Sequence, residues 1–225
     1  MTSFKRARSE EQRTQRRRMI LDTTAAMLAE MPVAQVSLNE LSRRVGLAKS
    51  NVLRYFESRE AVLLELLDAS SQEWLDQLHD ALTAAVNPNA SSSERGDQLA
   101  GTLATSLEAR PVLCDLVSSQ AAVLEHNVSP QIAAQYKRAA IASVAVLARL
   151  ILQYVPELGE RDAQRLAVAT ILVTSAVWTH ARPAAAMLAA YEADPSLASM
   201  RFDFTTTLRE TLEVLITGLL ARPLR

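Results

Sequence analysis

Hydrogen-bond donors are concentrated in one short stretch of the sequence. Lys49, Ser50, Asn51 and Arg54 lie within six positions of one another, with Leu53 among them. The guanidinium of an Arg matches the acceptor pair of guanine, and the amide of an Asn matches adenine. Ser hydroxyls and Lys ammonium groups commonly bind phosphate oxygens. If these side chains share the outer face of a helix, they could bind base edges and the phosphates beside them.

The charge of the chain is divided unevenly along its length. The 225 residues include 24 basic and 25 acidic ones, a net charge of −1. Residues 1–60 hold 12 Lys and Arg against seven Asp and Glu, a net charge of +5. Residues 61–225 hold 12 against 18, a net charge of −6. A basic end on an acidic body indicates an anionic partner for that end alone.

The donors require two short helices to position them. Ser37 followed three residues later by Glu40 is a capping box, which predicts a helix start. Gly46 supplies the left-handed residue that ends this helix. A second short helix is expected over about residues 49–56, and an apolar helix over about residues 11–31 precedes both. The arrangement is a helix-turn-helix, whose second helix fits the major groove of DNA.

Residues 11–66 resemble the N-terminal DNA-binding domain of the TetR family of transcriptional regulators. The matching segments are Leu41-Ser42 in place of Ile-Ala, Val45-Gly46-Leu47-Ala48 at the turn, Tyr55-Phe56 at the aromatic pair and Ser58-Arg59-Glu60 before the fourth helix. The resemblance implies an all-α fold of roughly nine to ten helices. It also implies a three-helix domain with a basic N-terminal arm at residues 1–60, and a helical effector-binding and dimerisation domain at residues 61–225.

The residues and the resemblance together predict a set of DNA contacts. Its members are Arg17, Arg18, Ser37, Lys49, Ser50, Asn51, Leu53, Arg54, Tyr55 and Arg59. Each has an ordinary structural alternative, because Ser37 is a helix cap, Tyr55 suits the core and a basic face is often only solvated. Two positions depart from the family pattern. Leu53 replaces a DNA-contacting Tyr, and Ala48 leaves the second helix without a side-chain cap, which costs about 1 kcal/mol.

The rest of the chain shows helical periodicity with few turn formers. Helices are expected to about residue 86 and then over 94–109, 111–126, 130–155, 160–181 and 202–221. The resemblance implies that the last two long helices form a four-helix dimer interface. The candidate interface residues are Leu208, Leu212, Leu215, Ile216 and Leu219. The same apolar stripe could instead belong to the core of one chain.

The larger domain also has candidates for an effector pocket. They mix apolar residues with polar ones at positions expected to face inward: Cys114, Val117, Ser118, Tyr136, Tyr154, Thr174, Ser175 and Trp178. Pockets are mostly apolar with a few placed polar groups, so we expect a largely apolar small-molecule effector. Ordinary helix packing and hydroxyl-to-carbonyl bonds would explain the same residues.

Other chemistries find little support in the sequence. The lone Cys114 cannot form an internal disulfide and fits a reducing compartment. Three His residues lack ligand-spaced partners and the five Gly are isolated, so no metal, phosphate loop or cofactor is expected. The apolar stretch over residues 166–178 is shorter than the roughly 20 residues of a membrane span. We therefore expect a cytoplasmic, non-enzymatic protein without a membrane partner.

The predicted function is a dimeric regulator, with repression more common in the family, that binds a palindromic operator and leaves it when a small molecule binds. The resemblance implies that a shift of the helix over residues 58–86 changes the spacing of the two reading helices. The alternative is a helical protein-interaction module whose helix-turn-helix has no specific DNA target, which the Leu53 departure would allow. An all-helical enzyme lacks a plausible catalytic site.

Overall fold

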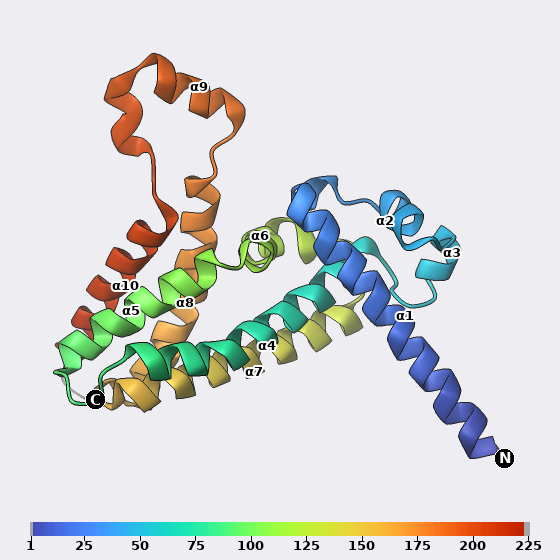
Figure 1. Cartoon of the computed structure of the whole chain (residues 1–225), viewed down its shortest axis with the longest axis horizontal. Coiled ribbons are helices and arrows are strands. Elements are labelled where there is room, and N and C mark those ends of the chain that lie inside the picture. Colours follow the sequence, from blue (N-terminus) through green and yellow to red (C-terminus); the bar gives the residue numbers. More distant parts are fainter. Residues whose placement is uncertain (1, 223–225) are drawn as a thin grey trace. The chain divides into compact units, whose positions relative to one another are not determined.

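The computed structural model of the chain is helical throughout (Figure 1). It describes the backbone of residues 2–222 and the side chains of residues 10–222 apart from Val123 and Ala198. The side chains of the basic arm before residue 10 therefore lie outside the described ones. Over the described residues there are ten α-helices and no β-strand. The all-α expectation is confirmed.

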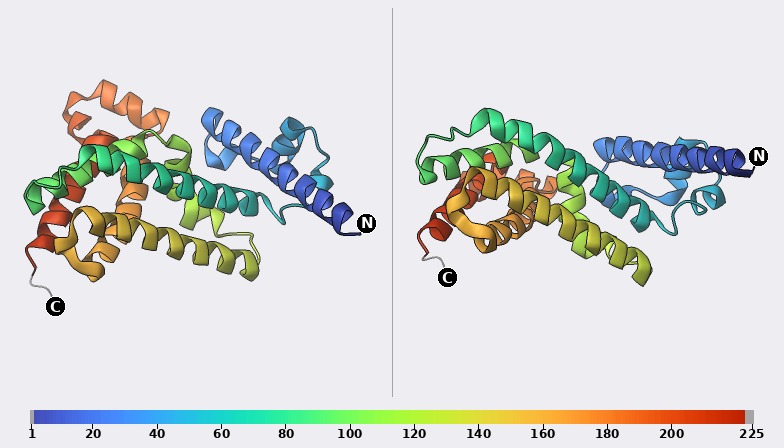
Figure 2. Two further views of the ribbon diagram at one scale, coloured as in Figure 1. Left: turned by 60° about the horizontal axis from the view of Figure 1, so that its bottom comes forward. Right: turned by 90° about the horizontal axis from the view of Figure 1, so that it is seen from below.

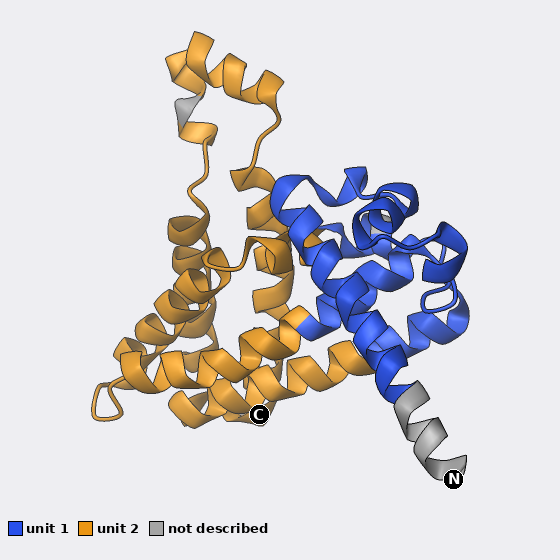
Figure 3. Cartoon of the chain, turned by 45° about the vertical axis from the view of Figure 1, so that its right-hand side comes forward, with its two compact units in different colours: residues 1–69, 119–137 blue, residues 70–118, 138–225 orange. Residues whose placement is uncertain are grey.

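The chain divides into two compact units, coloured separately in Figure 3. Unit 1 combines residues 1–69 with residues 119–137, and unit 2 combines residues 70–118 with residues 138–225. Unit 1 thus takes in two segments beyond residue 60. The functional boundary expected at residue 60 stays a prediction, because a division by contacts does not assign DNA or effector binding.

Unit 1 is built around three N-terminal helices, which Figure 2 shows as one group. Its elements are α1 (Thr2–Glu30), a 3-10 turn (Val33–Gln35), α2 (Leu38–Val45), α3 (Lys49–Val52), the first part of α4 (Arg59–Ala85), a π-helical turn (Gln120–Leu124) and the start of α7 (Pro130–Tyr154). Ile20 and Met27 of α1 are buried, as are Leu41 of α2 and Val52 of α3. Burial of these side chains holds the helix-turn-helix to α1.

The second short helix is shorter than predicted. The sequence indicated a helix over residues 49–56, whereas α3 ends at Val52. The chain then tightens, because the Val52 carbonyl accepts the N–H groups of both Tyr55 and Phe56, at 2.9 and 3.1 Å. As the cap-less Ala48 implied, no side chain caps the start of α3.

Unit 2 contains the remaining helices. They are the last part of α4, α5 (Ser92–Glu108), α6 (Pro111–Ser119), the last part of α7, a 3-10 turn (Pro156–Leu158), α8 (Gly159–Ala181), α9 (Ala185–Ala193), a second 3-10 segment (Pro195–Met200) and α10 (Phe204–Leu220). Helix α10 packs on α5 and α8. At Gly96 a Cβ atom would lie only 2.7 Å from Cγ2 of Ile216, so the absence of a side chain permits the close approach of α5 and α10.

Helix α9 belongs to an arm that connects α8 to α10 over residues 182–203. Figure 1 shows it standing away from those two helices. None of the α9 residues is buried, and Met187, Leu197, Met200 and Phe202 of the arm are exposed. The arm therefore adds little to the core of unit 2.

None of the described helices alone is long and apolar enough to cross a membrane. The segments Pro130–Tyr154 and Pro156–Ala181 together reach the required length and composition, but a bend of 111° separates them.

Candidate nucleic-acid interface and ligand pocket

The start of α2 follows the predicted pattern only in part. The Ser37 hydroxyl accepts the N–H of Glu40 at 3.2 Å, as a helix cap does. The Glu40 carboxylate does not complete the capping box and instead accepts hydrogen bonds from Arg43 and Arg44. These bonds lower the pKa of Glu40 to about 2. Glu40 is therefore an anchor for the basic end of α2.

The turn between α2 and α3 depends on glycine. Gly46 has a φ of 72°, in the left-handed region that favours a residue without Cβ. The N–H of Leu47 reaches back to the Ser42 carbonyl at 3.0 Å, which closes the last turn of α2. The predicted glycine stop is present, and it sets the direction in which α3 leaves.

Helix α3 presents the predicted donors to solvent. Lys49, Ser50 and Arg54 are exposed, Asn51 is half-buried, and Val52 beneath them is buried. Leu53 is 41% exposed on the same segment. Exposed polar side chains above a buried apolar residue match the geometry of a helix that enters the major groove.

Two predicted DNA contacts are engaged within unit 1. The Arg17 guanidinium pairs with Glu65, donates to the Tyr55 carbonyl at 2.6 Å and lies 4.4 Å from the centre of the Phe56 ring. Arg59 donates to the Val36 carbonyl at 2.9 Å and lies 3.2 Å from a Glu60 oxygen. Because these contacts hold both side chains within unit 1, we leave Arg17 and Arg59 out of the proposed contacting set, and their predicted DNA contacts stay predictions.

The other predicted residues remain available. Arg18 is exposed, and no ion pair joins it to another described side chain. The Ser37 hydroxyl accepts one bond as a cap and can still donate its proton. Tyr55 is half-buried. With Lys49, Ser50, Asn51, Leu53 and Arg54, these residues form the α3 face, the name used below for the candidate interface.

The predicted ligand residues belong to both units. Tyr136 belongs to unit 1, where burial raises its pKa, whereas the other seven belong to unit 2. The Tyr154 hydroxyl is hydrogen-bonded to Thr83 at 2.7 Å. The Ser118 hydroxyl donates to the carbonyls of Cys114 and Ser175, at 2.7 and 3.2 Å. Packing and hydroxyl-to-carbonyl bonds, the alternative reading of these residues, explain Ser118 and Tyr154.

Three further members of that set also lie in the core of unit 2. Cys114 is fully buried, which raises its thiol pKa to about 12. Val117 and Thr174 are buried as well, and no described group hydrogen-bonds the Thr174 hydroxyl. A thiol with so high a pKa remains protonated at neutral pH and is a poor nucleophile.

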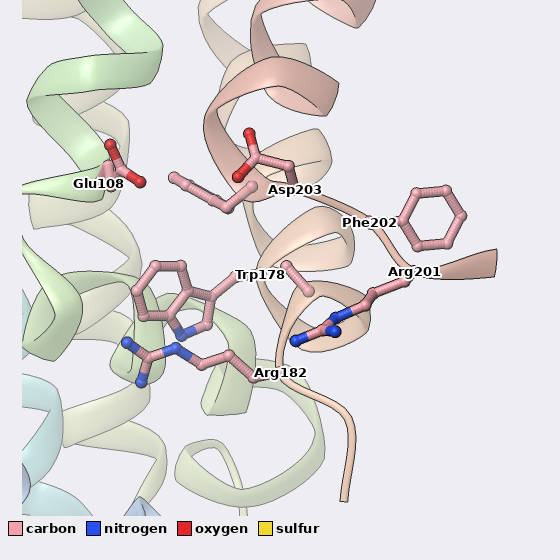
Figure 4. Close-up of a pocket in the computed structure, with 8 residues that line it drawn as sticks. Glu108, Trp178, Arg182, Arg201, Phe202 and Asp203 are labelled. Carbon is pink, nitrogen blue, oxygen red and sulfur yellow. The ribbon is translucent and has the colours of Figure 1, made fainter. Parts of the chain in front are cut away.

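One cavity of unit 2, of about 440 Å³, includes a predicted ligand residue (Figure 4). It is lined by Glu108, Trp178, Ala181, Arg182, Arg201, Phe202, Asp203 and Phe204. Of these residues, the predicted ligand set contained only Trp178. The run Arg201-Phe202-Asp203-Phe204 was an overlooked signal, since two aromatic residues flank a helix cap there. Half of the lining residues are charged, so the expected largely apolar effector stays a prediction.

Three of the predicted interface residues lie inside unit 2. Leu208, Leu212 and Ile216 are buried, where α10 packs on α5 and α8. They therefore pack within one chain, as the core alternative has it, and their part in a dimer interface stays a prediction. Leu215 and Leu219 are half-buried. The large apolar side chains that α8 and α10 leave exposed are Val168, Leu172 and Val214.

Over the residues that the structure describes, no three His, Cys, Asp or Glu side chains come together in a way that could hold an ion.

Two family models match the chain in adjoining segments. Residues 20–66 match bacterial regulatory proteins of the tetR family, and residues 68–223 match the C-terminal domain of tetracyclin repressor-like proteins. EthR of Mycobacterium tuberculosis is 41% identical over 49 residues, which span 22% of this chain and 23% of EthR. BetI of Cronobacter sakazakii is 27% identical over 85 residues, which span 38% of this chain and 40% of BetI. Each alignment thus covers well under half of the relative.

Solved structures resemble the chain over most of its length. A TetR transcriptional regulator from Rhodococcus sp. RHA1 matches with a TM-score of 0.56 and 14% identity, covering 92% of this chain and 96% of that one. FadR of Bacillus subtilis, solved with stearoyl-CoA, matches with a TM-score of 0.55 and 14% identity, covering 89% and 97%. These likenesses show the fold. Since the C-terminal model alone covers more than half of the sequence, the chain belongs to the TetR family of bacterial transcriptional regulators.

Proposed function

We propose that the protein binds a palindromic operator as a homodimer, through the α3 face, and represses transcription until a small molecule releases it. The α3 face carries this proposal, because Lys49, Ser50 and Arg54 are exposed above a buried Val52. Arg and Asn side chains on such a face discriminate between bases, while Lys and Ser bind the flanking phosphates. The protein would act in the cytoplasm, where its DNA is.

Titration of the full-length protein on DNA from its own promoter region tests the proposal. A labelled promoter duplex and a scrambled duplex of equal length would be compared at several salt concentrations. We expect the promoter duplex to bind at least about a hundredfold more tightly, with affinity that falls steeply with salt because phosphate contacts release counterions. Equal, weak binding to both duplexes would contradict operator recognition.

Dimerisation is proposed to use the outer sides of α8 and α10. Val168, Leu172 and Ala176 follow one another at four-residue spacing on α8, and all three are exposed. Val214 and Gly218 are exposed at the same spacing on α10. Residues four apart share a helix face, and the small Ala176 and Gly218 would allow a partner helix to approach closely. Two such faces related by two-fold symmetry make a four-helix interface.

Effector release requires coupling between the two units. Helix α4 contributes residues to both of them, since unit 1 ends at residue 69 and unit 2 begins at residue 70. In one conformation of the dimer, the spacing of the two α3 helices does not fit the operator. A ligand that binds this conformation better lowers the affinity for the operator, and DNA lowers the affinity for the ligand by the same factor. FadR of Bacillus subtilis, with its stearoyl-CoA, is a relative in fold for which a ligand is known.

Leu53 supports a second candidate function. This exposed apolar side chain lies at the tip of α3, where a hydrogen-bonding residue would suit DNA better. A helical module that binds another protein through this tip would use Leu53 as an anchor. The variant Leu53→Ser separates the two functions: operator binding would persist or improve, whereas binding to a protein partner would be lost.

A further inference from the structure

The cavity of unit 2 has a rigid aromatic wall. Trp178 and Phe204 are both buried and meet edge to face, with ring centres 4.8 Å apart and an angle of 87°. The indole N–H of Trp178 donates to Asp115 at 2.6 Å, which fixes the orientation of the ring. A flat apolar body could therefore lie against these rings without first ordering them.

Two of the four charged lining residues already have partners. The Arg182 guanidinium lies 3.9 Å from the centre of the Trp178 ring and 3.9 Å from an Asp115 oxygen. The Asp203 carboxylate accepts the N–H of Thr206 at 2.8 Å, which caps α10 and lowers the Asp203 pKa. Arg182 also occupies the indole face that a cationic ligand would otherwise use.

The other two charged residues have opposite signs. Glu108 and Arg201 line the cavity, and no ion pair or hydrogen bond joins either side chain to another described residue. Figure 4 shows them on either side of the Trp178 ring. Glu108 is the last residue of α5, where the helix dipole adds negative potential, and Arg201 precedes the start of α10, where it adds positive potential. The cavity thus has one negative and one positive end.

We propose that this cavity binds a small zwitterion, with an amine at Glu108, a carboxylate at Arg201 and an aromatic or hydrocarbon body between them. The body lies on the Trp178 and Phe204 rings. A volume of about 440 Å³ suits a small organic molecule. The inference goes beyond the proposed function, because it concerns binding and holds whether or not the ligand changes affinity for DNA.

Three matched probes test the charge requirement on the full-length protein by isothermal titration calorimetry. They are 4-(aminomethyl)benzoate, which carries both charges, 4-methylbenzoate, which carries only the carboxylate, and 4-methylbenzylamine, which carries only the amine. The zwitterion should bind at least about tenfold more tightly than either single-charge probe. Equal affinity for the three probes, or no measurable binding of the zwitterion at about 10 mM, overturns the proposal.

Two variants assign the ends of the ligand. Glu108→Gln should abolish the preference for the zwitterion over 4-methylbenzoate, and Arg201→Gln should abolish the preference over 4-methylbenzylamine. Glu210→Gln, at an exposed carboxylate of α10 outside the cavity lining, is the matched control and should keep both preferences. If the control loses them as well, or if neither cavity variant changes them, the assignment is wrong.

A second readout comes from the indole itself. The chain has two Trp residues, so a Trp74→Phe background leaves Trp178 as the sole Trp, and the zwitterion should change the indole emission. Operator binding is measured separately in the same samples. Charge-selective binding without release of the operator would support the zwitterion site and would count against this cavity as the effector site. The zwitterion site and the proposed release of DNA can therefore fail independently.

Discussion

Arg17 of α1 and Glu65 of α4 form an ion pair within unit 1, in which the Arg17 Nε donates to a Glu65 oxygen at 3.2 Å and a terminal nitrogen donates to the other. The remaining terminal nitrogen donates to the Tyr55 carbonyl at 2.6 Å. One guanidinium thus joins α1, the turn after α3 and the beginning of α4. These contacts favour a positioning role for Arg17, whose predicted contact with DNA stays a prediction.

The pair predicts that Arg17→Ala destabilises the protein by about 1–2 kcal/mol. Both side chains are about a third exposed, so the ion pair itself is weak, and most of the loss comes from the unpaired Tyr55 carbonyl. Chemical denaturation would measure this difference in the free energy of unfolding between the variant and the wild type. Glu65→Gln should have a smaller effect of the same sign.

The same two variants distinguish a positioning role from a phosphate contact. If Arg17 positions α3, both variants weaken operator binding and leave its salt dependence unchanged. A reduction of about one in the salt slope for Arg17→Ala, with none for Glu65→Gln, would show that Arg17 contacts phosphate directly.

Arg54 and Arg18 are expected to contribute to operator binding in different ways. Arg54 lies beside the predicted reading helix, and Arg54→Ala should cost about 1–3 kcal/mol on the operator and little on a scrambled duplex. Arg18 lies on α1, and Arg18→Ala should weaken both duplexes alike and reduce the salt slope by about one. Identical profiles for the two variants would contradict this division of roles.

Features that depend on one helical turn were predictable from the sequence. The Ser37 cap and the left-handed Gly46 are set by the residue itself and by its neighbours within four positions. The all-α class follows from periodicity in the same way. The early end of α3 was not predictable, because it depends on two hydrogen bonds to one carbonyl rather than on a breaker residue.

Features that depend on distant contacts were not predictable. Arg17 meets a carboxylate 48 positions away, and nothing in a basic run indicates which Arg is paired. Apolar residues cover a wide part of the circumference of α10. Only the packing of α10 on α5 and α8 shows that Leu208 and Leu212 face inward while Val214 faces out. Glu108, at the end of α5, and Arg201, in the segment before α10, line one cavity although they are far apart in the sequence.

The Glu40 carboxylate makes stability depend on pH in the acidic range. Hydrogen bonds from Arg43 and Arg44 lower its pKa from an ordinary value near 4.5 to about 2. The stabilisation is therefore fully present above about pH 4.5 and is lost as the pH falls toward 2. Melting temperatures of the wild type and of Glu40→Gln should differ at pH 7 and converge at about pH 2. An unchanged difference at low pH would contradict the assignment.

Two glycines of α5 provide a matched pair for the packing of α10. A Cβ at Gly96 would lie 2.7 Å from Cγ2 of Ile216, whereas a Cβ at Gly101 would have Cδ of Arg209 as its nearest neighbour, at 4.0 Å. Gly96→Ala should therefore destabilise unit 2 by about 1–3 kcal/mol, through overpacking. Gly101→Ala should be neutral or stabilise by up to about 1 kcal/mol, because Ala favours a helix. Equal effects in chemical denaturation would mean that α5 and α10 are not closely packed.

The proposed dimer face can be tested by placing charge on it. Leu172 and Val214 are 65% and 73% exposed, so replacing either by Glu disturbs little packing within the chain. Burial of a carboxylate against its own copy in a partner is strongly unfavourable. Leu172→Glu and Val214→Glu should therefore give folded monomers by light scattering after size exclusion. They should also lose operator affinity, because one helix-turn-helix makes too few contacts.

Ile141 on α7 is the matched control for this test. It is 69% exposed, so Ile141→Glu makes the same chemical change at equal exposure and lies outside the proposed face. We expect it to remain a dimer with unchanged operator affinity. If Ile141→Glu is monomeric while Leu172→Glu and Val214→Glu remain dimers, the interface lies on α7 and not on α8 and α10. A wild-type chain that is already monomeric would refute the dimer itself, without bearing on the charge selectivity of the cavity.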